Sequence, residues 1–308
     1  MARAAVPNGA LWPHAGPVSA GPFGGQLVTS GPDRSRSAGP ILQVRSEVDL
    51  TKDVGIRREF AARRTRLPAA FIAVALIVGV LAGCSSPVNT QGARILHLTV
   101  DSRLVHGTMP LTLVTPAGGG AHRPLLVFLH GLGYDNNSQL TDQMFAALHA
   151  LGPRAPDIAF PYGGQSWWVN GASGAWSSYV LDEVIPKALK VLHADPRRVA
   201  IGGISMGGSG AYVIAGLDPG RFCAVGGHSA AIYPGTDGSL GNPRLYGHAQ
   251  LWLDVGAQDP SFTVGDGQLA NALHIHLHIW PGGHDFGYWN AHWSEYLGFY
   301  AHALATCR

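Results

Sequence analysis

The strongest chemical signal in the sequence is a serine inside a Gly-x-Ser-x-Gly motif. Gly203, Ser205 and Gly207 follow the apolar run 199–202 and stand at the start of a helical pattern over 207–217. Glycines at the two outer positions permit a tight strand-to-helix turn, which lifts the serine hydroxyl clear of the sheet at a helix N-terminus. The motif therefore predicts that Ser205 is a nucleophile.

A serine hydroxyl is a weak nucleophile at neutral pH, so it needs a histidine base that an acid holds in place. His284 is the expected base, because it follows Gly282 and Gly283 on a loop after an apolar run. Loops at the carboxyl ends of strands are where such sheets carry their ligand-binding groups. The alternating histidines of 274–278 are expected to be surface or packing side chains rather than a metal site.

Two aspartates precede His284 and compete for the role of the acid. Asp254 lies inside the predicted strand 251–255, where its side chain would point into a helix-covered face. Asp259 lies beyond the strand's end, where a loop can turn it toward the imidazole. We expect Asp259 to be the acid. Asp285, next to the base, cannot easily fold back to the ring and is expected to cap a helix.

Attack of a serine on a carbonyl group creates an oxyanion, which two backbone N–H groups must stabilise. The residue after the nucleophile, Met206, is expected to supply one of them. The other is expected from the glycine-containing loop 130–134, with Leu132 as the first choice and Gly131 as the alternative. Nearby aromatic residues could line a substrate cleft, or alternatively pack in the core: Tyr162, Trp167, Trp168 and Trp176.

The elements that must position these residues alternate between strand-like and helical patterns from Arg94 onward. This alternation predicts one α/β domain over 94–308, with a mostly parallel central sheet and helices on both faces. The sequence predicts a hairpin of strands 95–100 and 111–114, followed by strands 125–129, 158–160, 199–202, 223–225, 251–255 and 274–279. The helices are expected at 141–151, 178–192, 207–217, 267–273 and 288–305.

The segment before this domain has the character of an export leader. An uncharged apolar stretch runs from Leu67 to Cys84 and follows five arginines, at positions 57, 58, 63, 64 and 66. This order of charge and apolarity is typical of a signal peptide, and Leu81-Ala-Gly-Cys84 resembles a bacterial lipobox. We expect a lipoprotein signal peptide at 54–83, lipidation of Cys84 and a tether at 84–93. An uncleaved transmembrane helix is the alternative.

Residues 1–53 fit neither version of the leader, because a signal peptide has only about 15 to 30 residues. They are rich in Gly, Pro, Ser and Arg and lack an apolar period. Such a segment is expected to be disordered, or to be an extension from a mis-assigned start. In either case the predicted location is the extracytoplasmic face of the cell membrane, reached through a lipid anchor.

Charge and cysteine content narrow the class of protein further. Residues 1–83 contain ten Lys/Arg against five Asp/Glu, whereas residues 84–308 contain eleven against fourteen. The predicted domain therefore has no positive excess that would favour nucleic acid as a partner. Only Cys223 and Cys307 remain besides Cys84. Outside the cytoplasm such a pair favours a disulfide, which would tie the last helix to a strand.

Four motifs occur in one order along the domain: HGLG at 130–133, GGISMGG at 202–208, LDVGAQDP at 253–260 and PGGHDFGYW at 281–289. In these motifs the chain resembles the esterase D and mycolyltransferase-like branch of the α/β-hydrolases. That branch includes secreted feruloyl esterases and polyhydroxybutyrate-depolymerase-like lipoproteins. The resemblance implies the α/β-hydrolase fold and a serine carboxylic ester hydrolase that requires no cofactor.

The resemblance leaves the acceptor of the acyl group open. The expected substrate is a small-molecule or cell-envelope ester, and the alternative activity is a cell-envelope acyltransferase of the mycolyltransferase type. A third hypothesis is an idle binding lipoprotein that uses the fold as a scaffold. It is disfavoured because a scaffold has no reason to keep Ser205, Asp259 and His284 in order.

Overall fold

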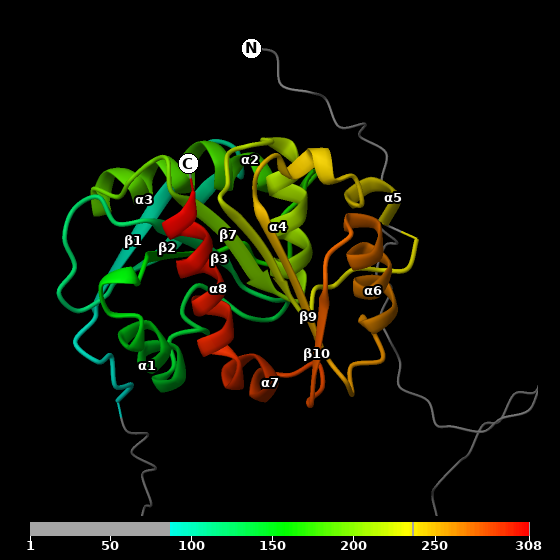
Figure 1. The fold of residues 1–308 in the computed structure, drawn as a ribbon. Helices are drawn as coiled ribbons and strands as arrows, with labels where there is room; N and C mark the ends of the chain where they lie inside the picture. The colour runs from blue at the N-terminus through cyan, green and yellow to red at the C-terminus, as the bar shows by residue number, and fades with distance from the viewer. Residues whose placement is uncertain (1–86, 236, 308) are drawn as a thin grey trace, which may run out of the picture. The chain divides into compact units, whose positions relative to one another are not determined.

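A single eight-stranded sheet organises the part of the chain that the structure describes. The structure is a computed structural model that describes residues 87–235 and 237–307 (Figure 1). The strand order is β1-β2-β4-β3-β7-β8-β9-β10. These strands are β1 (Arg94–Ser102), β2 (Gly107–Thr115), β3 (Leu125–Leu129), β4 (Asp157–Pro161), β7 (Val199–Ile204), β8 (Ala224–His228), β9 (Gln250–Gly256) and β10 (Leu277–Trp280). The short strands β5 (Asn170–Gly171) and β6 (Gly174–Ala175) form a separate ribbon.

The direction of the strands sets where the loops meet. The hairpin β1–β2 is antiparallel, and β2 also pairs antiparallel with β4. All pairs from β4 through β3, β7, β8 and β9 to β10 are parallel. The loops that follow β3, β7, β9 and β10 therefore emerge at one edge of the sheet. The predicted mostly parallel sheet and the N-terminal hairpin are confirmed.

Helices cover both faces of the sheet, as Figure 1 shows, and each face has its own apolar core. In β3, Val127 and Leu129 belong to one core, and Leu126 and Phe128 to the other. Because both faces are covered, the strand is a continuous apolar run rather than an alternating one. The first core includes α2 (Trp176–Tyr179), α3 (Ile185–Leu192), α4 (Met206–Leu217) and α6 (Thr263–Leu273). The second includes α1 (Asp142–Ala150), α7 (Phe286–Ala291) and α8 (Trp293–Thr306), while α5 (Asp237–Leu240) follows β8.

Two of the predicted helices are interrupted in the structure. The prediction over 178–192 is realised as α2, a π-helical turn Val180–Val184 and α3. Pro186 lies in the first turn of α3 and has no N–H to donate, so the widened turn in front of it absorbs the break. The single helix predicted over 288–305 is wrong, because α7 and α8 separate at His292. The imidazole of His292 bonds to the Tyr288 carbonyl oxygen at 2.7 Å, which removes that acceptor from the helix.

The last strand is shorter than the alternating histidines suggested. His274 has φ 56° and ends α6 in the left-handed conformation, so the strand begins only at Leu277. The predicted strand start at 274 is therefore wrong. Within the strand, the ring of His278 stacks on Trp252 of β9 with 3.8 Å between centroids. Capping of the preceding helix thus overrides the alternating pattern.

The predicted leader lies outside the described residues. The extension 1–53, the signal peptide 54–83 and the lipidated Cys84 accordingly stay predictions. Among residues 87–307 other than 236, no helix has both the length and the apolar character needed to cross a membrane.

A disulfide connects Cys223 and Cys307, with 5.6 Å between their Cα atoms. Cys223 directly precedes β8, and Cys307 directly follows α8. The bridge therefore fastens the end of the last helix to the sheet, at the edge where the parallel strands begin. It closes a loop with a sequence separation of 84 residues.

Removing this bridge is expected to destabilise the fold without rearranging it. The double variant Cys223→Ser, Cys307→Ser should lose about 2 to 5 kcal/mol of unfolding free energy, because its unfolded chain is no longer constrained by a long closed loop. Urea unfolding followed by circular dichroism measures this loss. Reductant should lower the midpoint of the wild-type chain and leave that of the double variant unchanged. Equal midpoints for the two proteins under oxidising conditions would contradict the expectation.

Candidate active site

Ser205 occupies a strained turn between β7 and α4. Its backbone has φ 52° and ψ −119°, a conformation that non-glycine residues rarely adopt. A Cβ at Gly203 would lie 2.6 Å from the Leu129 carbonyl oxygen, and one at Gly207 would lie 2.2 Å from the same atom. Only glycine fits at either position. The motif is therefore needed for close packing of the turn against the end of β3.

Backbone hydrogen bonds hold this turn in place from both sides. The Ser205 N–H donates to the His228 carbonyl oxygen at 3.0 Å, and the Ala231 N–H donates to the Ser205 carbonyl oxygen at 3.0 Å. Both partners belong to β8 or the loop after it. The serine side chain is consequently fixed relative to the neighbouring strand and not only to its own helix.

Ser205, His284 and Asp259 lie in one hydrogen-bonded row. Ser205 Oγ is 2.8 Å from His284 Nε2, and His284 Nδ1 is 2.8 Å from Asp259 Oδ2. The Asp259 side chain is fully buried and that of His284 is 26% exposed, so solvent reaches the imidazole but not the carboxylate. The carboxylate can only accept, which assigns the proton on His284 to Nδ1 and leaves Nε2 free to accept from the serine.

The loops after β9 and β10 are joined to each other beside this row. The Gln258 N–H donates to the Gly282 carbonyl oxygen at 2.8 Å, and the Gly282 N–H donates to Gln258 Oε1 at 2.6 Å. Asp259 follows Gln258 directly, and His284 lies two residues after Gly282. The reciprocal pair therefore sets the distance between acid and base.

A second buried carboxylate, Asp254, organises the elements behind the row. Its Oδ2 accepts from His228 Nδ1 at 2.6 Å and from Trp252 Nε1 at 2.8 Å. Its Oδ1 accepts from the hydroxyls of Tyr288 at 2.8 Å and Tyr296 at 3.2 Å. As predicted, this strand-borne acid points into a helix-covered face, and it contacts neither Ser205 nor His284 by a described hydrogen bond.

The Asp254 cluster influences the titration of its neighbours. Burial, followed by the charge of Asp254, raises the pKa of Tyr288, Tyr296 and Tyr300 well above the usual tyrosine range. All three hydroxyls therefore stay protonated and can act as donors. The Tyr300 hydroxyl also lies 2.9 Å from His228 Nε2, which extends the cluster to α8.

Asp266 is a further fully buried carboxyl, in the first turn of α6. Burial, with smaller contributions from Asp254 and Asp259, raises the pKa of Asp266 well above its usual range. Burial therefore favours the protonated form of this carboxyl more than it would be favoured in an exposed aspartate.

The loop after β3 is braced by His130, whose burial lowers the pKa of the imidazole. His130 Nε2 accepts from the Gly163 N–H at 3.0 Å, so the ring proton is on Nδ1, which donates to the Gly131 carbonyl oxygen at 2.8 Å. In a trans peptide the C=O and the following N–H point in opposite directions. Holding the Gly131 carbonyl therefore also fixes the direction of the Leu132 N–H.

The two expected oxyanion donors have suitable local settings. Met206 is the first residue of α4, where a helix leaves its N–H groups without intrahelical partners. Gly131 lies against the nucleophile, since a Cβ there would be 3.3 Å from Ser205 Cβ. Leu132 follows it and is 46% exposed.

The aromatic residues after β4 divide between core and surface. Trp168 and Trp176 are buried in the apolar core, so of the two alternatives for these residues it is the packing role that the structure shows. Trp168 fills the space beside Gly163 and Gly210, both of which lack a Cβ that would collide with its ring. Trp167, by contrast, is half-buried and has φ 56°.

A row of half-buried aromatic rings leads from Trp167 to the base. The centroid of Trp167 is 6.0 Å from that of Tyr233, which is 5.7 Å from Phe262. Phe262 in turn is 4.7 Å from the imidazole of His284. Tyr233 and Phe262 come from loops that the motifs did not single out. Only their aromatic character beside a predicted strand end could have indicated them.

Comparison with known families agrees with this geometry. The pattern that defines the family described as "Putative esterase" matches residues 103–300, which include Ser205, Asp259 and His284. The chain belongs to this family. The predicted resemblance to esterase D and mycolyltransferase-like α/β-hydrolases is confirmed.

A mycobacterial protein is similar in sequence to part of the chain. A diacylglycerol acyltransferase/mycolyltransferase Ag85A of Mycobacterium gordonae is 25% identical over 213 residues, which make up 61% of this chain and 62% of that protein. The match thus spans somewhat less than two thirds of that relative.

Among solved structures, a ferulic acid esterase superposes with a TM-score of 0.59 at 18% identity, covering 68% of this chain and 99% of that one. An S-formylglutathione hydrolase from Agrobacterium tumefaciens gives 0.59 at 17% identity, covering 71% and 99%. These likenesses confirm the α/β-hydrolase fold.

Asp259 bonds to His284 and Asp254 bonds to His228, so substitution of each aspartate should have a different effect. Asp259→Asn keeps the shape of the acid but favours the wrong imidazole tautomer, so ester turnover should fall by up to about 10⁴-fold at a nearly unchanged thermal midpoint. Asp254→Asn replaces an acceptor by a donor inside the cluster, so it should cost about 1 to 3 kcal/mol of stability and retain most turnover. Steady-state kinetics measures the turnover of both variants, and thermal unfolding measures their stability. Loss of turnover at unchanged midpoint in Asp254→Asn, with Asp259→Asn active, would reverse the assignment.

Proposed function

We propose that the protein is a serine carboxylic ester hydrolase, with Ser205 as nucleophile, His284 as general base and Asp259 as the acid that orients the base. The observation that carries this proposal is the unbroken row of two hydrogen bonds, each 2.8 Å, from the serine hydroxyl to a buried carboxylate. Membership of the putative esterase family supports the same reaction class.

In the first step Ser205 Oγ attacks the ester carbonyl carbon while its proton passes to His284 Nε2. The negative charge collects on the former carbonyl oxygen, where the N–H groups of Met206 and Leu132 are the proposed donors. Asp259 stabilises the imidazolium that forms without taking its proton. The bond to the alcohol oxygen then breaks, and His284 gives its proton to the departing alkoxide.

In the second step a water molecule attacks the acyl-enzyme. His284 removes a proton from the water and returns one to Ser205 Oγ, which releases the carboxylic acid and restores the starting state. The ester, one water molecule and the side chains of Ser205 and His284 account for every bond and proton in these two steps. The row of Trp167, Tyr233 and Phe262 leads to the base and offers contact for an apolar or aromatic part of the ester.

Acyl transfer to an alcohol other than water is the second candidate activity. It is favoured by the 25% identity to a diacylglycerol acyltransferase/mycolyltransferase. Both activities share the acyl-enzyme and differ only in what attacks it. A sugar acceptor added during turnover distinguishes them, because a transferase yields acylated sugar faster than free acid.

The nucleophile is tested by Ser205→Ala. This variant should lose hydrolysis of a chain-length series of nitrophenyl esters and should no longer be labelled by a serine-reactive phosphonate, because the attacking oxygen is gone. Ser209→Ala is the matched control. The Ser209 hydroxyl lies one turn further along α4 and donates to the Met206 carbonyl oxygen. Turnover and labelling that persist in Ser205→Ala would refute the assignment of the nucleophile.

The same proposal extends to location: an exported lipoprotein, anchored to the extracytoplasmic face of the membrane through acylated Cys84. It is supported by the apolar stretch 67–83 after clustered arginines and by the Leu81-Ala-Gly-Cys84 sequence. A lipid chain at Cys84 would keep the catalytic domain near envelope esters.

Removal of the lipidation site tests this location. Cys84→Ala in the native host should give a chain that incorporates no labelled palmitate and leaves the membrane fraction, because the cysteine of the lipobox sequence is gone. Ser85→Ala, one residue later, is the matched control and should behave as wild type. A Cys84→Ala protein that still sediments with membranes and keeps its leader would favour the transmembrane alternative instead.

A further inference from the structure

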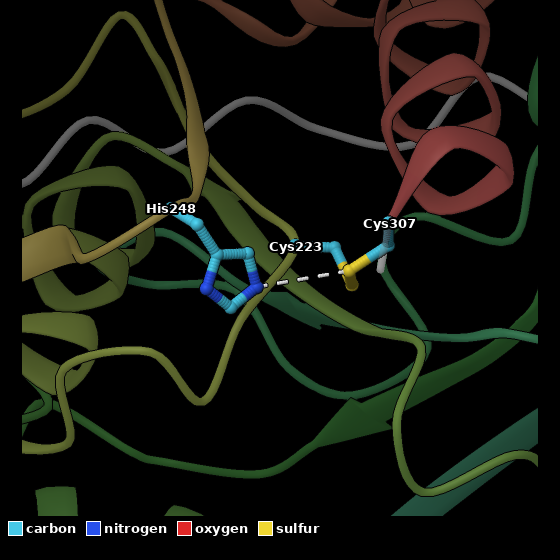
Figure 2. Close-up of side chains that lie close together, drawn as sticks. All are labelled: Cys223, His248 and Cys307. Atoms are coloured by element: carbon cyan, nitrogen blue, oxygen red, sulfur yellow. Dashed lines mark hydrogen bonds between the residues drawn. A yellow bond between two sulfur atoms is a disulfide. The ribbon is translucent and has the colours of Figure 1, made fainter.

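The two sulfurs of the disulfide and one imidazole form a cluster of atoms that could bind a metal ion. The cluster lies at the opposite edge of the sheet from Ser205. The imidazole of His248 lies beside Cys223 and Cys307 (Figure 2), with Nε2 3.8 Å from Cys307 Sγ. The three potential ligand atoms all lie within 4.8 Å of one another. They line an open pocket of about 200 Å³ together with Gln250 and Thr306.

The spacing of these atoms is close to that of a tetrahedral zinc site. With Zn–N near 2.0 Å and Zn–S near 2.3 Å, the nitrogen and sulfur ligands of one ion lie about 3.5 Å apart. The distance from His248 Nε2 to Cys307 Sγ exceeds this by only a few tenths of an ångström. The two sulfurs, now bonded to each other, would have to separate to about 3.8 Å. Rotation of two side chains supplies that separation, because Cys307 follows the end of a helix and is half-buried.

A fourth ligand position is also available. The Arg197 carbonyl oxygen lies 3.5 Å from Cys223 Sγ and 3.9 Å from Cys307 Sγ. Both distances are close to the separation expected between two ligands of one ion. The open pocket also has room for a water molecule as the fourth ligand. The set of two sulfurs, one imidazole and one oxygen is one that zinc accepts.

We propose that Cys223, His248 and Cys307 form a zinc site when the disulfide is reduced, so that the metal and the disulfide are alternative ways of closing the same junction. A phosphine reductant takes up the oxygen of one water to become its oxide, and the disulfide gains two electrons and two protons. Zn²⁺ then displaces the two thiol protons and binds two thiolates and the neutral imidazole. The ion holds the end of α8 against β8, as the disulfide does in the oxidised chain.

The test compares reduced and oxidised full-length chain with zinc and with cobalt as probes. The chain is treated anaerobically with a trialkylphosphine, freed of reductant and dialysed against Zn²⁺. The reduced wild type should retain one more zinc ion per chain than the oxidised wild type. Co²⁺ in place of zinc should give the intense near-ultraviolet band of thiolate-to-cobalt charge transfer. Equal metal content of the reduced and oxidised proteins would overturn the proposal.

Variants assign the ligands and exclude binding by other histidines. His248→Ala should weaken zinc binding of the reduced chain by at least about tenfold, the loss that even outer-shell partners commonly cause. His276→Ala, which removes an exposed imidazole far along the chain, should bind zinc as the wild type does. Cys223→Ser with Cys307→Ser should show no cobalt–thiolate band. A His248→Ala protein with unchanged affinity, or a loss of equal size in His276→Ala, contradicts the assigned site.

Ester turnover of the same samples reports whether the reduced chain is folded. Ser205 lies at the opposite edge of the sheet, so turnover should be the same with disulfide, with zinc and with free thiols. If reduction alone abolishes turnover, zinc must restore it in the wild type and fail to do so in His248→Ala. Absence of that recovery also counts against the site. Because zinc binding is measured separately, the result does not depend on the proposed activity.

Discussion

A carboxylate buried away from water must be surrounded by hydrogen-bond donors, and Asp254 obtains its donors from four different elements. His228 belongs to β8, Trp252 to β9, Tyr288 to α7 and Tyr296 to α8. Leaving any of these polar groups unpaired inside the protein would cost about 1 to 3 kcal/mol. The requirement for complete pairing therefore fixes how two strands and two helices meet. Ser205 and His284 are both attached to those elements.

The Asp254 cluster is linked directly to Ser205 on one side and to the segment after His284 on the other. His228 uses its side chain for Asp254 and its carbonyl oxygen for the Ser205 N–H, so the cluster reaches the strained turn. Tyr288 lies in α7, the helix that begins two residues after His284 and is capped by Asp285. A strained backbone persists only where the surroundings over-determine it. The Asp254 cluster, together with the glycines at 203 and 207, provides that surrounding structure. Asp259 lies outside the cluster: its Oδ2 faces the imidazole of His284, and its Oδ1 accepts from the Ser261 N–H.

The sequence predicted the sheet, the covering helices and the residues of the row, because each is encoded locally. Ser205 stands in a motif with a steric reason for its glycines, and His284 and Asp259 follow strand ends. The capping role of Asp285 was also predictable, and its Oδ1 accepts from the Tyr288 N–H at 3.0 Å. What could not be predicted depends on contacts across the fold. No local pattern indicates that His292 takes the Tyr288 carbonyl, that four donors converge on Asp254, or that Trp168 is buried beside Gly210.

The aromatic row beside the base has a consequence for how such a protein changes over evolutionary time. Trp167, Tyr233 and Phe262 come from three separate loops, and none of them contributes a side chain to the Asp254 cluster. Surface loops tolerate substitution and insertion better than the elements they connect. Substitution of these three side chains can therefore alter which esters fit, while the neighbouring loop residues that hold Ser205 and His284 stay unchanged. A combinatorial library confined to these three positions would explore substrate range with little risk to folding.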